Sequence, residues 1–330
     1  MKQNGELGDF LRSRRARLRP EDAGVAFSGG ARRVPGLRRE EVAHLAGVST
    51  DYYARLEQGR HPHVSETVLE AVASALRLDD LERGYLFELA RPKTPGPGRH
   101  RPARVPRVRP AVHRMLDVLD DVSPALVINH RSDVLAGNHL AHALITDFDT
   151  LPYRERNLAR FVLLHPAARD LYRDWDKVAE TFVASLRLAA GRHPDDPQLN
   201  ELIGELSIKV PQFHTWWASH RVDQCAHGTQ RLRHPVVGEL TLSYETLALP
   251  ADPDQTICLY TAERGSASAE TLRLLASWST PTGVEASSPS GHGMARRNVA
   301  SWAAPSVLHE TGGPEVLRLE EIPAPVAASP

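Results

Sequence analysis

Five side chains within residues 50 to 58 have the chemistry needed to read the edges of DNA bases. They are Thr50, Asp51, Tyr52, Arg55 and Gln58. An arginine can bind guanine through two hydrogen bonds, a glutamine can bind adenine in the same way, and an acid accepts from cytosine. At 100° per residue, Tyr53 and Leu56 fall on the opposite side of such a helix. The spacing predicts a helix that packs through one side and contacts base pairs of double-stranded DNA through the other.

The residues before this helix predict the element that positions it. Val42, Leu45 and Ala46 recur at helical spacing and indicate a first helix with an apolar stripe. Gly47 tolerates the left-handed backbone of a tight turn, and Ser49 is a good N-cap for the next helix. Two short helices joined in this way form a helix-turn-helix, which places its second helix in the major groove. The alternative is a surface helix with an ordinary polar face, which the ordered glycine turn and serine cap disfavour.

Charge is distributed unevenly along the chain, which supports a nucleic-acid partner. Residues 1 to 110 hold 21 Lys and Arg against 14 Asp and Glu, and the remainder holds 19 against 27. A basic region beside the motif would neutralise phosphates. We expect phosphate contacts from Arg38, Arg39, Ser49 and Arg60. Glu41 lies three residues after Arg38, so half of a capping box remains at the first helix.

Composition favours a protein of two domains without catalytic chemistry. The 330 residues contain two cysteines in no CxxC spacing, and neither His139 with His142 nor Cys225 with His227 has a third ligand nearby. Nucleophile-elbow, HExxH and Walker motifs are absent. We therefore expect no enzyme activity, no cofactor and no metal. With no apolar signal segment and no membrane span, we expect a cytoplasmic protein.

The predicted elements divide the chain into four parts. Residues 1–90 should form a helix-turn-helix bundle, 91–110 a basic linker rich in Pro and Arg, 111–278 an α+β domain, and 279–330 a disordered tail. In the second domain we predict a helix at 112–122 and a hairpin from ALVIN and VLAGN. Helices at 156–164, 166–191, 197–206 and 211–221 should follow, then strands at 233–235, 236–249 and 256–263, and a helix at 268–278.

Several phrases resemble known regulators. Residues 7 to 90 resemble the five-helix DNA-binding bundle of the Xre and lambda-repressor-like family. The phrases PGLRREEVAHLAGVSTDYYARLEQGR, HPDDPQLNELIGELS, RHPVVGELTLSYETLALPADPDQ and YTAE closely resemble MmyB-like regulators, over residues 7 to 278. The resemblance implies a PAS-like second domain with added helices and a fatty-acid-like ligand. As such motifs usually do, the bundle should act as a homodimer that reads half-sites about 34 Å apart.

Large apolar side chains of the second domain are candidates for the wall of a ligand pocket. The candidates are Phe182, Phe213, Trp217 and Leu242, with His227, Arg231 or Asn138 as a polar anchor. Aromatic groups at such positions are more often plain core, and it is the family resemblance that favours a small amphipathic ligand.

The tail carries a second resemblance. Residues 307–326 resemble the N-terminal hairpin of quinone oxidoreductases, but the rest of that catalytic core is absent. A fragment of this size cannot form a core, so we expect it to have no role in regulation. Two alternatives to a ligand-controlled transcription regulator remain: a protein-interaction module without specific DNA binding, and an oxidoreductase fragment.

Overall fold

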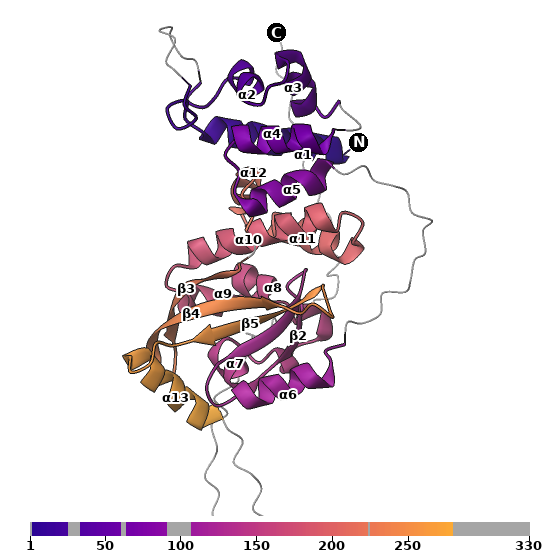
Figure 1. Cartoon of the computed structure of the whole chain (residues 1–330). Coiled ribbons are helices and arrows are strands. Elements are labelled where there is room, and N and C mark those ends of the chain that lie inside the picture. The colour runs from indigo at the N-terminus through magenta and orange to yellow at the C-terminus, as the bar shows by residue number, and fades with distance from the viewer. Residues whose placement is uncertain (1, 26–33, 61–63, 91–106, 224, 280–330) are drawn as a thin grey trace, which may run out of the picture.

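The computed structural model describes residues 2–25, 34–60, 64–90, 107–223 and 225–279, with the side chains of residues 2–4 and 279 excepted. Residues 91–106 of the predicted linker and residues 280–330 of the predicted tail, including the oxidoreductase-like segment, lie outside this range. Figure 1 shows a helical bundle at one end and an α+β unit at the other.

The bundle consists of amphipathic helices around one apolar core. Its elements are α1 (Lys2–Arg17), α2 (Arg39–Leu45), α3 (Thr50–Glu57), α4 (Glu66–Ala75) and α5 (Asp80–Ala90). Phe10, Tyr53 and Tyr85 are fully buried in this core. Aromatic side chains of this size each bury about 150–250 Å².

The local signals for the helix-turn-helix are present in the fold. Gly47 has a φ of 65°, and the amide of Val48 donates to the Ala43 carbonyl at 2.9 Å, which closes α2. Ser49 caps α3 by accepting from the Tyr52 amide at 3.1 Å. Capping of this kind contributes about 1 kcal/mol and determines where each helix begins and ends.

One part of the predicted α2 stripe was wrong. Leu45 is 39% exposed, whereas Val42, Ala43 and Ala46 are buried. The buried face of this short helix is centred between Val42 and Ala43, so Leu45 is rotated to its edge.

The second unit is one antiparallel sheet with helices on both faces. Its strands are β1 (Ala125–Asn129), β2 (Val134–Gly137), β3 (His227–His234), β4 (Gly238–Ala248) and β5 (Gln255–Thr261), in the order β2-β1-β5-β4-β3. Its helices are α6 (Pro110–Leu119), α7 (His139–Leu144), α8 (Leu158–Leu164), α9 (Pro166–Leu171), α10 (Trp175–Arg192), α11 (Pro197–Lys209), α12 (Phe213–Ala218) and α13 (Ala267–Ser279), with the short 3-10 turns Phe148–Thr150 and Tyr153–Glu155.

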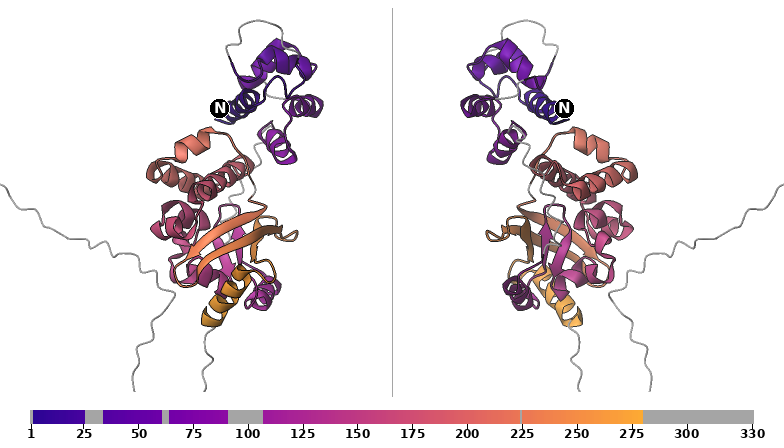
Figure 2. Two further views of the ribbon diagram at one scale, coloured as in Figure 1. Left: turned by 90° about the vertical axis from the view of Figure 1, so that its left-hand side faces the viewer. Right: turned by 90° about the vertical axis from the view of Figure 1, so that its right-hand side faces the viewer.

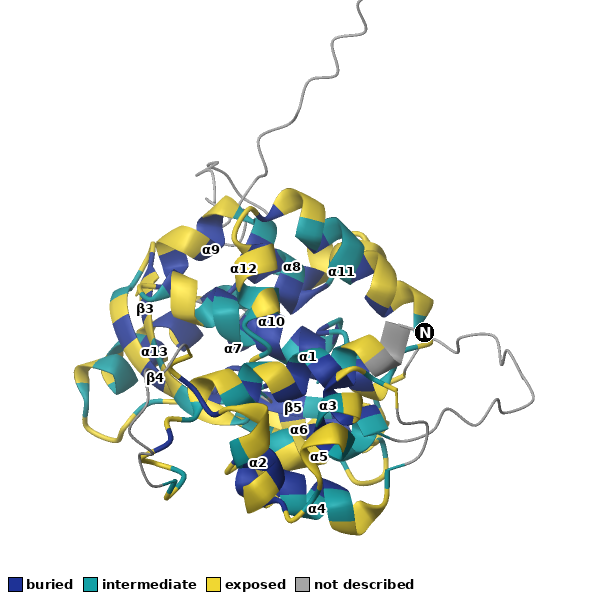
Figure 3. Ribbon diagram, turned by 90° about the horizontal axis from the view of Figure 1, so that it is seen from above, coloured by how far each residue is buried: buried dark blue, intermediate teal, exposed yellow. Residues whose placement is uncertain are grey.

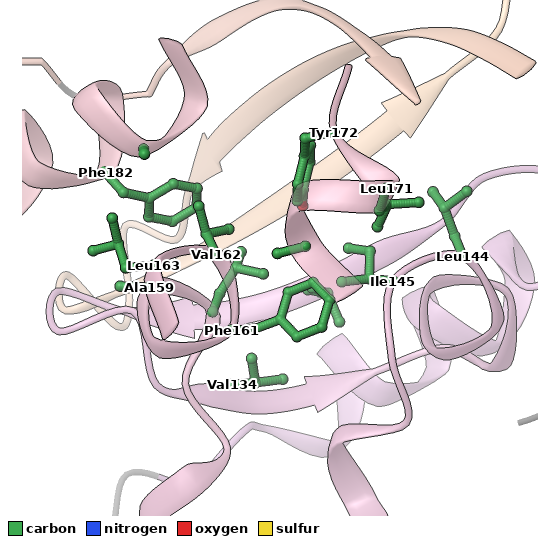
Figure 4. Packing of buried hydrophobic residues seen from close by; sticks show 14 of the residues in the cluster. Val134, Leu144, Ile145, Ala159, Phe161, Val162, Leu163, Leu171, Tyr172 and Phe182 are labelled. Atoms are coloured by element: carbon green, nitrogen blue, oxygen red, sulfur yellow. The ribbon is translucent and has the colours of Figure 1, made fainter. Parts of the chain in front are cut away.

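Side chains alternate across the sheet and so build two apolar layers. Leu126, Leu242 and Tyr260 pack with α7 to α11 and α13 in the larger core, part of which is drawn in Figure 4. Val127 and Ile257 point to the other face and pack under α6. Because neighbouring residues of a strand face opposite sides, both layers are specified by the strand register.

The structure confirms the predicted hairpin and changes other boundaries. The single helix predicted at 166–191 was wrong, because Tyr172 leaves the helix to pair with Leu232 of β3 and separates α9 from α10. Strand β3 begins at His227 instead of the predicted residue 233, and α7 was not predicted.

None of the helices within the described residues has the length and apolarity needed to cross a bilayer.

The two side views in Figure 2 place helices α10, α11 and α12 between the bundle and the sheet. The α+β unit therefore presents a helical layer to the bundle and not an edge of its sheet.

Candidate DNA interface and ligand cavity

The outward side of α3 is accessible. Thr50, Asp51, Arg55 and Gln58 are exposed and Tyr52 is half-buried, whereas Tyr53 and Leu56 are buried, as the helical wheel predicts. Figure 1 places α2 and α3 at the end of the molecule farthest from the sheet. Figure 3 views this end from above, with exposed and buried residues alternating along the helices of the bundle. Nothing among the described residues covers this side of α3.

Two of the predicted base readers contact each other. A guanidinium nitrogen of Arg55 lies 2.6 Å from Asp51 Oδ2, and both side chains are more than half exposed. An exposed pair four residues apart on a helix contributes only about 0.3–0.5 kcal/mol. Arg55 can therefore exchange Asp51 for a base edge at low cost, and Asp51 can orient it.

The predicted phosphate contacts have unequal surroundings. Arg38 and Arg60 are exposed, and the Arg38 amide donates to Glu41 at 2.6 Å, which is the predicted half of a capping box. Ser49 uses an oxygen lone pair as a cap, and its hydroxyl hydrogen remains able to donate to phosphate. Arg39 donates to Glu57 at 2.7 Å while its side chain stays 45% exposed. All four assignments stay predictions.

A buried carboxylate beneath α3 was missed by the sequence reasoning. Glu57 is 2% exposed and accepts from Arg15 at 2.6 Å as well as from Arg39. It follows Tyr53 by one helical turn, so the wheel places it on the inward side. That position was the available signal. This three-residue ion network joins α1, α2 and α3, and thereby holds α3 on the bundle.

The bundle is docked on the α+β unit through α1. Arg14 is 5% exposed, pairs with Glu82 at 2.8 Å and donates to the His220 carbonyl at 2.7 Å. The Ser13 hydroxyl donates to the Ser219 carbonyl at 3.1 Å. Arg14 therefore serves the contact between the two units.

Helix α10 supplies the other side of this contact. Arg187 is 2% exposed, lies 3.6 Å from Glu6 Oε1, donates to the Trp217 carbonyl, and has its guanidinium 4.4 Å from the Trp217 ring centre. It also lies 3.1 Å from Nδ1 of His220. Burial, with added repulsion from Arg187, lowers the pKa of His220 to about 4. His220 is therefore neutral near pH 7 and can accept from Arg187.

The two units approach closely at Gly191 of α10. A Cβ atom at this position would lie 2.4 Å from Cε2 of Tyr85 on α5. Leu188 and Val222 of the α+β unit are buried together with the core of the bundle. The absent side chain of Gly191 thus permits an apolar contact between α10 and α5.

A cavity of about 510 Å³ lies along α10, against the inner face of β3, β4 and β5. Its apolar wall includes Ile128, Leu158, Val178, Phe182, Leu188 and Tyr260. Both cysteines, Cys225 and Cys258, also line it, and neither forms a disulfide. Cavities of this size hold drug-sized ligands. Helix α10 therefore lines the cavity and also contacts the helix-turn-helix bundle, and Leu188 belongs to both.

Two of the predicted pocket residues line this cavity. Phe182 belongs to its apolar wall, and Arg231 lies at its rim, where two guanidinium nitrogens bind Asp174 at 2.7 and 2.8 Å. These hydrogen bonds lower the pKa of Asp174. Arg231 thus has a carboxylate partner already, and a ligand would have to compete for it.

The other predicted pocket residues lie outside the cavity lining. Leu242 shares a face of β4 with the lining residue Tyr244 but is fully buried in the core. Phe213 and Trp217 stack on each other with ring centres 5.4 Å apart, next to the contact with the bundle. His227 is exposed at the start of β3. Asn138 is buried and caps α7 by accepting from the Ala141 amide at 3.0 Å. Tertiary packing places these side chains in ways that spacing alone does not reveal.

Comparison with protein families agrees with this division. The model for the MmyB-like transcription regulator ligand binding domain matches residues 108–275, which is half of the chain. The chain belongs to the MmyB-like transcription regulators. A helix-turn-helix domain model matches residues 6–86. No curated protein matched. With these two domains, this MmyB-like regulator is a DNA-binding transcription regulator, and its cavity lies in the domain whose family description includes ligand binding.

Proposed function

We propose that this MmyB-like regulator binds a specific double-stranded DNA sequence as a homodimer, through α3, under the control of a small amphipathic ligand of the fatty-acid type. The observation that carries the proposal is the position of α10, which lines the cavity and also contacts the bundle. A ligand that shifts α10 would change how the bundle is held. The antiparallel order β2-β1-β5-β4-β3, with helices over the cavity, supports a PAS-like sensor for this role.

The DNA half of the proposal is tested with Arg55. Selection of bound fragments from a random DNA library should yield one preferred sequence, and Arg55→Ala should relax the preference at one base position at a cost of about 1–3 kcal/mol. Arg38→Ala is the matched control, since an exposed phosphate contact should weaken binding to all sequences alike. Equal, sequence-independent losses from both variants would show that α3 is oriented differently.

A salt titration separates this function from that of a protein-interaction module. Affinity for DNA should fall steeply with salt, with a slope of about −0.9 for each phosphate contacted. A flat salt dependence would contradict the DNA function.

The ligand half is tested by filling the cavity. Ser185→Trp places a large ring where α10 faces the cavity, and we expect it to weaken binding of dansyl-undecanoic acid, a fluorescent fatty acid, by at least about tenfold. Ile208→Trp on α11 is the matched control, because Ile208 is 85% exposed and lies outside the cavity lining. Unchanged affinity in Ser185→Trp, measured by fluorescence titration, would place the probe elsewhere.

A further inference from the structure

Three potential metal ligands meet at one end of the cavity. His130 lies in the turn between β1 and β2, His193 caps the C-terminal end of α10, and Asp254 lies in the turn before β5. One ligand atom from each lies within 4.8 Å of the other two, and all three residues line the cavity. Their separation along the chain hides the cluster from any search by spacing.

His130 is oriented with one ring nitrogen held and the other available. Its Nε2 lies 2.8 Å from Oδ2 of Asp196, whereas its buried Nδ1 has no hydrogen-bond partner among the described residues. A buried polar atom without a partner is costly, and an ion bound there would remove that cost. A carboxylate on the far nitrogen is the usual support of a metal-binding histidine, because it orients the ring and raises its basicity.

Asp196 is well suited to this supporting role. It also accepts from Arg131 at 2.9 Å and caps α11 through the Gln198 amide at 2.9 Å. Asp196 is therefore a carboxylate in a fixed position.

His193 completes the nitrogen pair. Its ring stacks on His130 with the ring centres 4.0 Å apart. A neutral imidazole is the form that coordinates a metal, and Asp254 adds a negative charge at the exposed side of the cluster.

We propose that His130, His193 and Asp254 bind a divalent transition-metal ion of the zinc type. Nitrogen and carboxylate oxygen are ligands that Zn²⁺ accepts, at about 2.0–2.2 Å, which sets tetrahedral ligand atoms roughly 3.3 Å apart. The ligand atoms, now within 4.8 Å of one another, reach that spacing when the His193 ring rotates out of its stack on His130, because a metal lies in the plane of each imidazole that binds it. Three protein ligands leave a coordination position, and it faces the cavity that these residues line.

The ion would connect the cavity to the docking contact. It would hold the two turns at the end of the sheet against the end of α10, two residues after Gly191, which contacts Tyr85 of the bundle. Metal binding should therefore stiffen the helix through which the two units meet.

A second cluster of similar composition does not offer the same arrangement. His142 lies near Asp147 and Asp149, but its Nδ1 is already 3.0 Å from Asp147. Its Nε2 faces the backbone of Gly137, where a Cβ atom would lie only 2.4 Å away. This cluster provides a matched control.

The test is a titration of the full chain, after dialysis against a chelator, with CoCl₂ and then with ZnCl₂ in competition. We expect one Co²⁺ per chain with visible absorption of a low-symmetry site, displaced by Zn²⁺. His193→Ala and Asp254→Ala should each weaken binding by at least about tenfold, and Asp196→Asn by about 10- to 100-fold. Asp149→Ala should change nothing, since Asp149 belongs to the second cluster.

Circular dichroism checks that each variant is folded. Asp254 is exposed, so Asp254→Ala should fold and keeps the test valid even if a histidine variant does not. Absence of visible absorption from the wild-type chain, or equal Co²⁺ affinity in Asp254→Ala, would overturn the proposal. Because the readout needs neither DNA nor a fatty acid, its failure is distinguishable from failure of the proposed function.

Discussion

Replacing Glu57 by Ala is expected to lower the free energy of unfolding of the helix-turn-helix bundle by about 3 kcal/mol. The variant leaves the guanidinium of Arg15, which is 15% exposed, without its carboxylate, and removes the link from α3 to α1 and α2. Arg39 is 45% exposed and can turn to water, which places the loss at the low end for a broken buried ion pair. Denaturant unfolding followed by circular dichroism measures the change, and specific DNA binding should fall with it.

Glu57→Gln separates charge from hydrogen bonding at the same position. The amide oxygen can still accept from one arginine, so its loss should lie between that of Glu57→Ala and wild type. Asp51→Ala, on the exposed side of the same helix, is the control and should change stability by no more than about 0.5 kcal/mol. A loss below that value in Glu57→Ala would mean that apolar packing alone holds α3 in place.

Replacing Arg187 by Ala is expected to separate the two units and to abolish the effect of a ligand on DNA affinity. Arg187 is almost fully buried, and its removal leaves Glu6 and the Trp217 carbonyl without their guanidinium partner. Loss of one partner of a buried ion pair costs about 3–5 kcal/mol, and Glu6, which is 30% exposed, reduces that value by reaching water. Small-angle scattering should report a larger radius of gyration, and the affinity for DNA should no longer respond to the fatty-acid probe.

A second variant tests the same contact without altering charge. Gly191→Ala places a Cβ atom against the ring of Tyr85 and should weaken docking by steric overlap, while the cavity keeps its lining because Gly191 is not one of the lining residues. Gly204→Ala is the matched control, since a Cβ atom there meets nothing within 4 Å. If Arg187→Ala and Gly191→Ala both retain full ligand response, control does not pass through α10.

The sequence predicted best those features that depend on neighbours within one or two helical turns. Tyr53 and Leu56 point inward and Asp51 and Arg55 outward because a period of 3.6 residues determines the faces of any helix. The turn at Gly47 and the β1–β2 hairpin were also predicted from residues that are close together in the chain. The same reasoning failed at the break between α9 and α10, where Tyr172 is held by Leu232 of β3, sixty residues later in the chain.

The predicted pocket residues show a second reason why sequence patterns do not locate a ligand site. Large apolar residues share one composition whether they fill a core or line a cavity, so Leu242 and Phe182 were indistinguishable in the sequence. Only the tertiary arrangement distinguishes them, because Phe182 on α10 borders the cavity and Leu242 on β4 does not. Arg231 is a comparable case, since its partner Asp174 lies on another element.

By itself, the sequence determined a helix-turn-helix, the side of α3 that faces outward, and a second domain of mixed helices and strands, because periodicity, glycine turns and caps act over short distances. Tertiary structure alone decided that Glu57 is a buried ion bridge, that Arg14 and Arg187 join the two units, and that His130, His193 and Asp254 meet. Those relations join residues far apart in the chain. The interaction energies of these contacts depend on burial and on charges brought close together by the fold, and no local pattern of residues encodes that proximity.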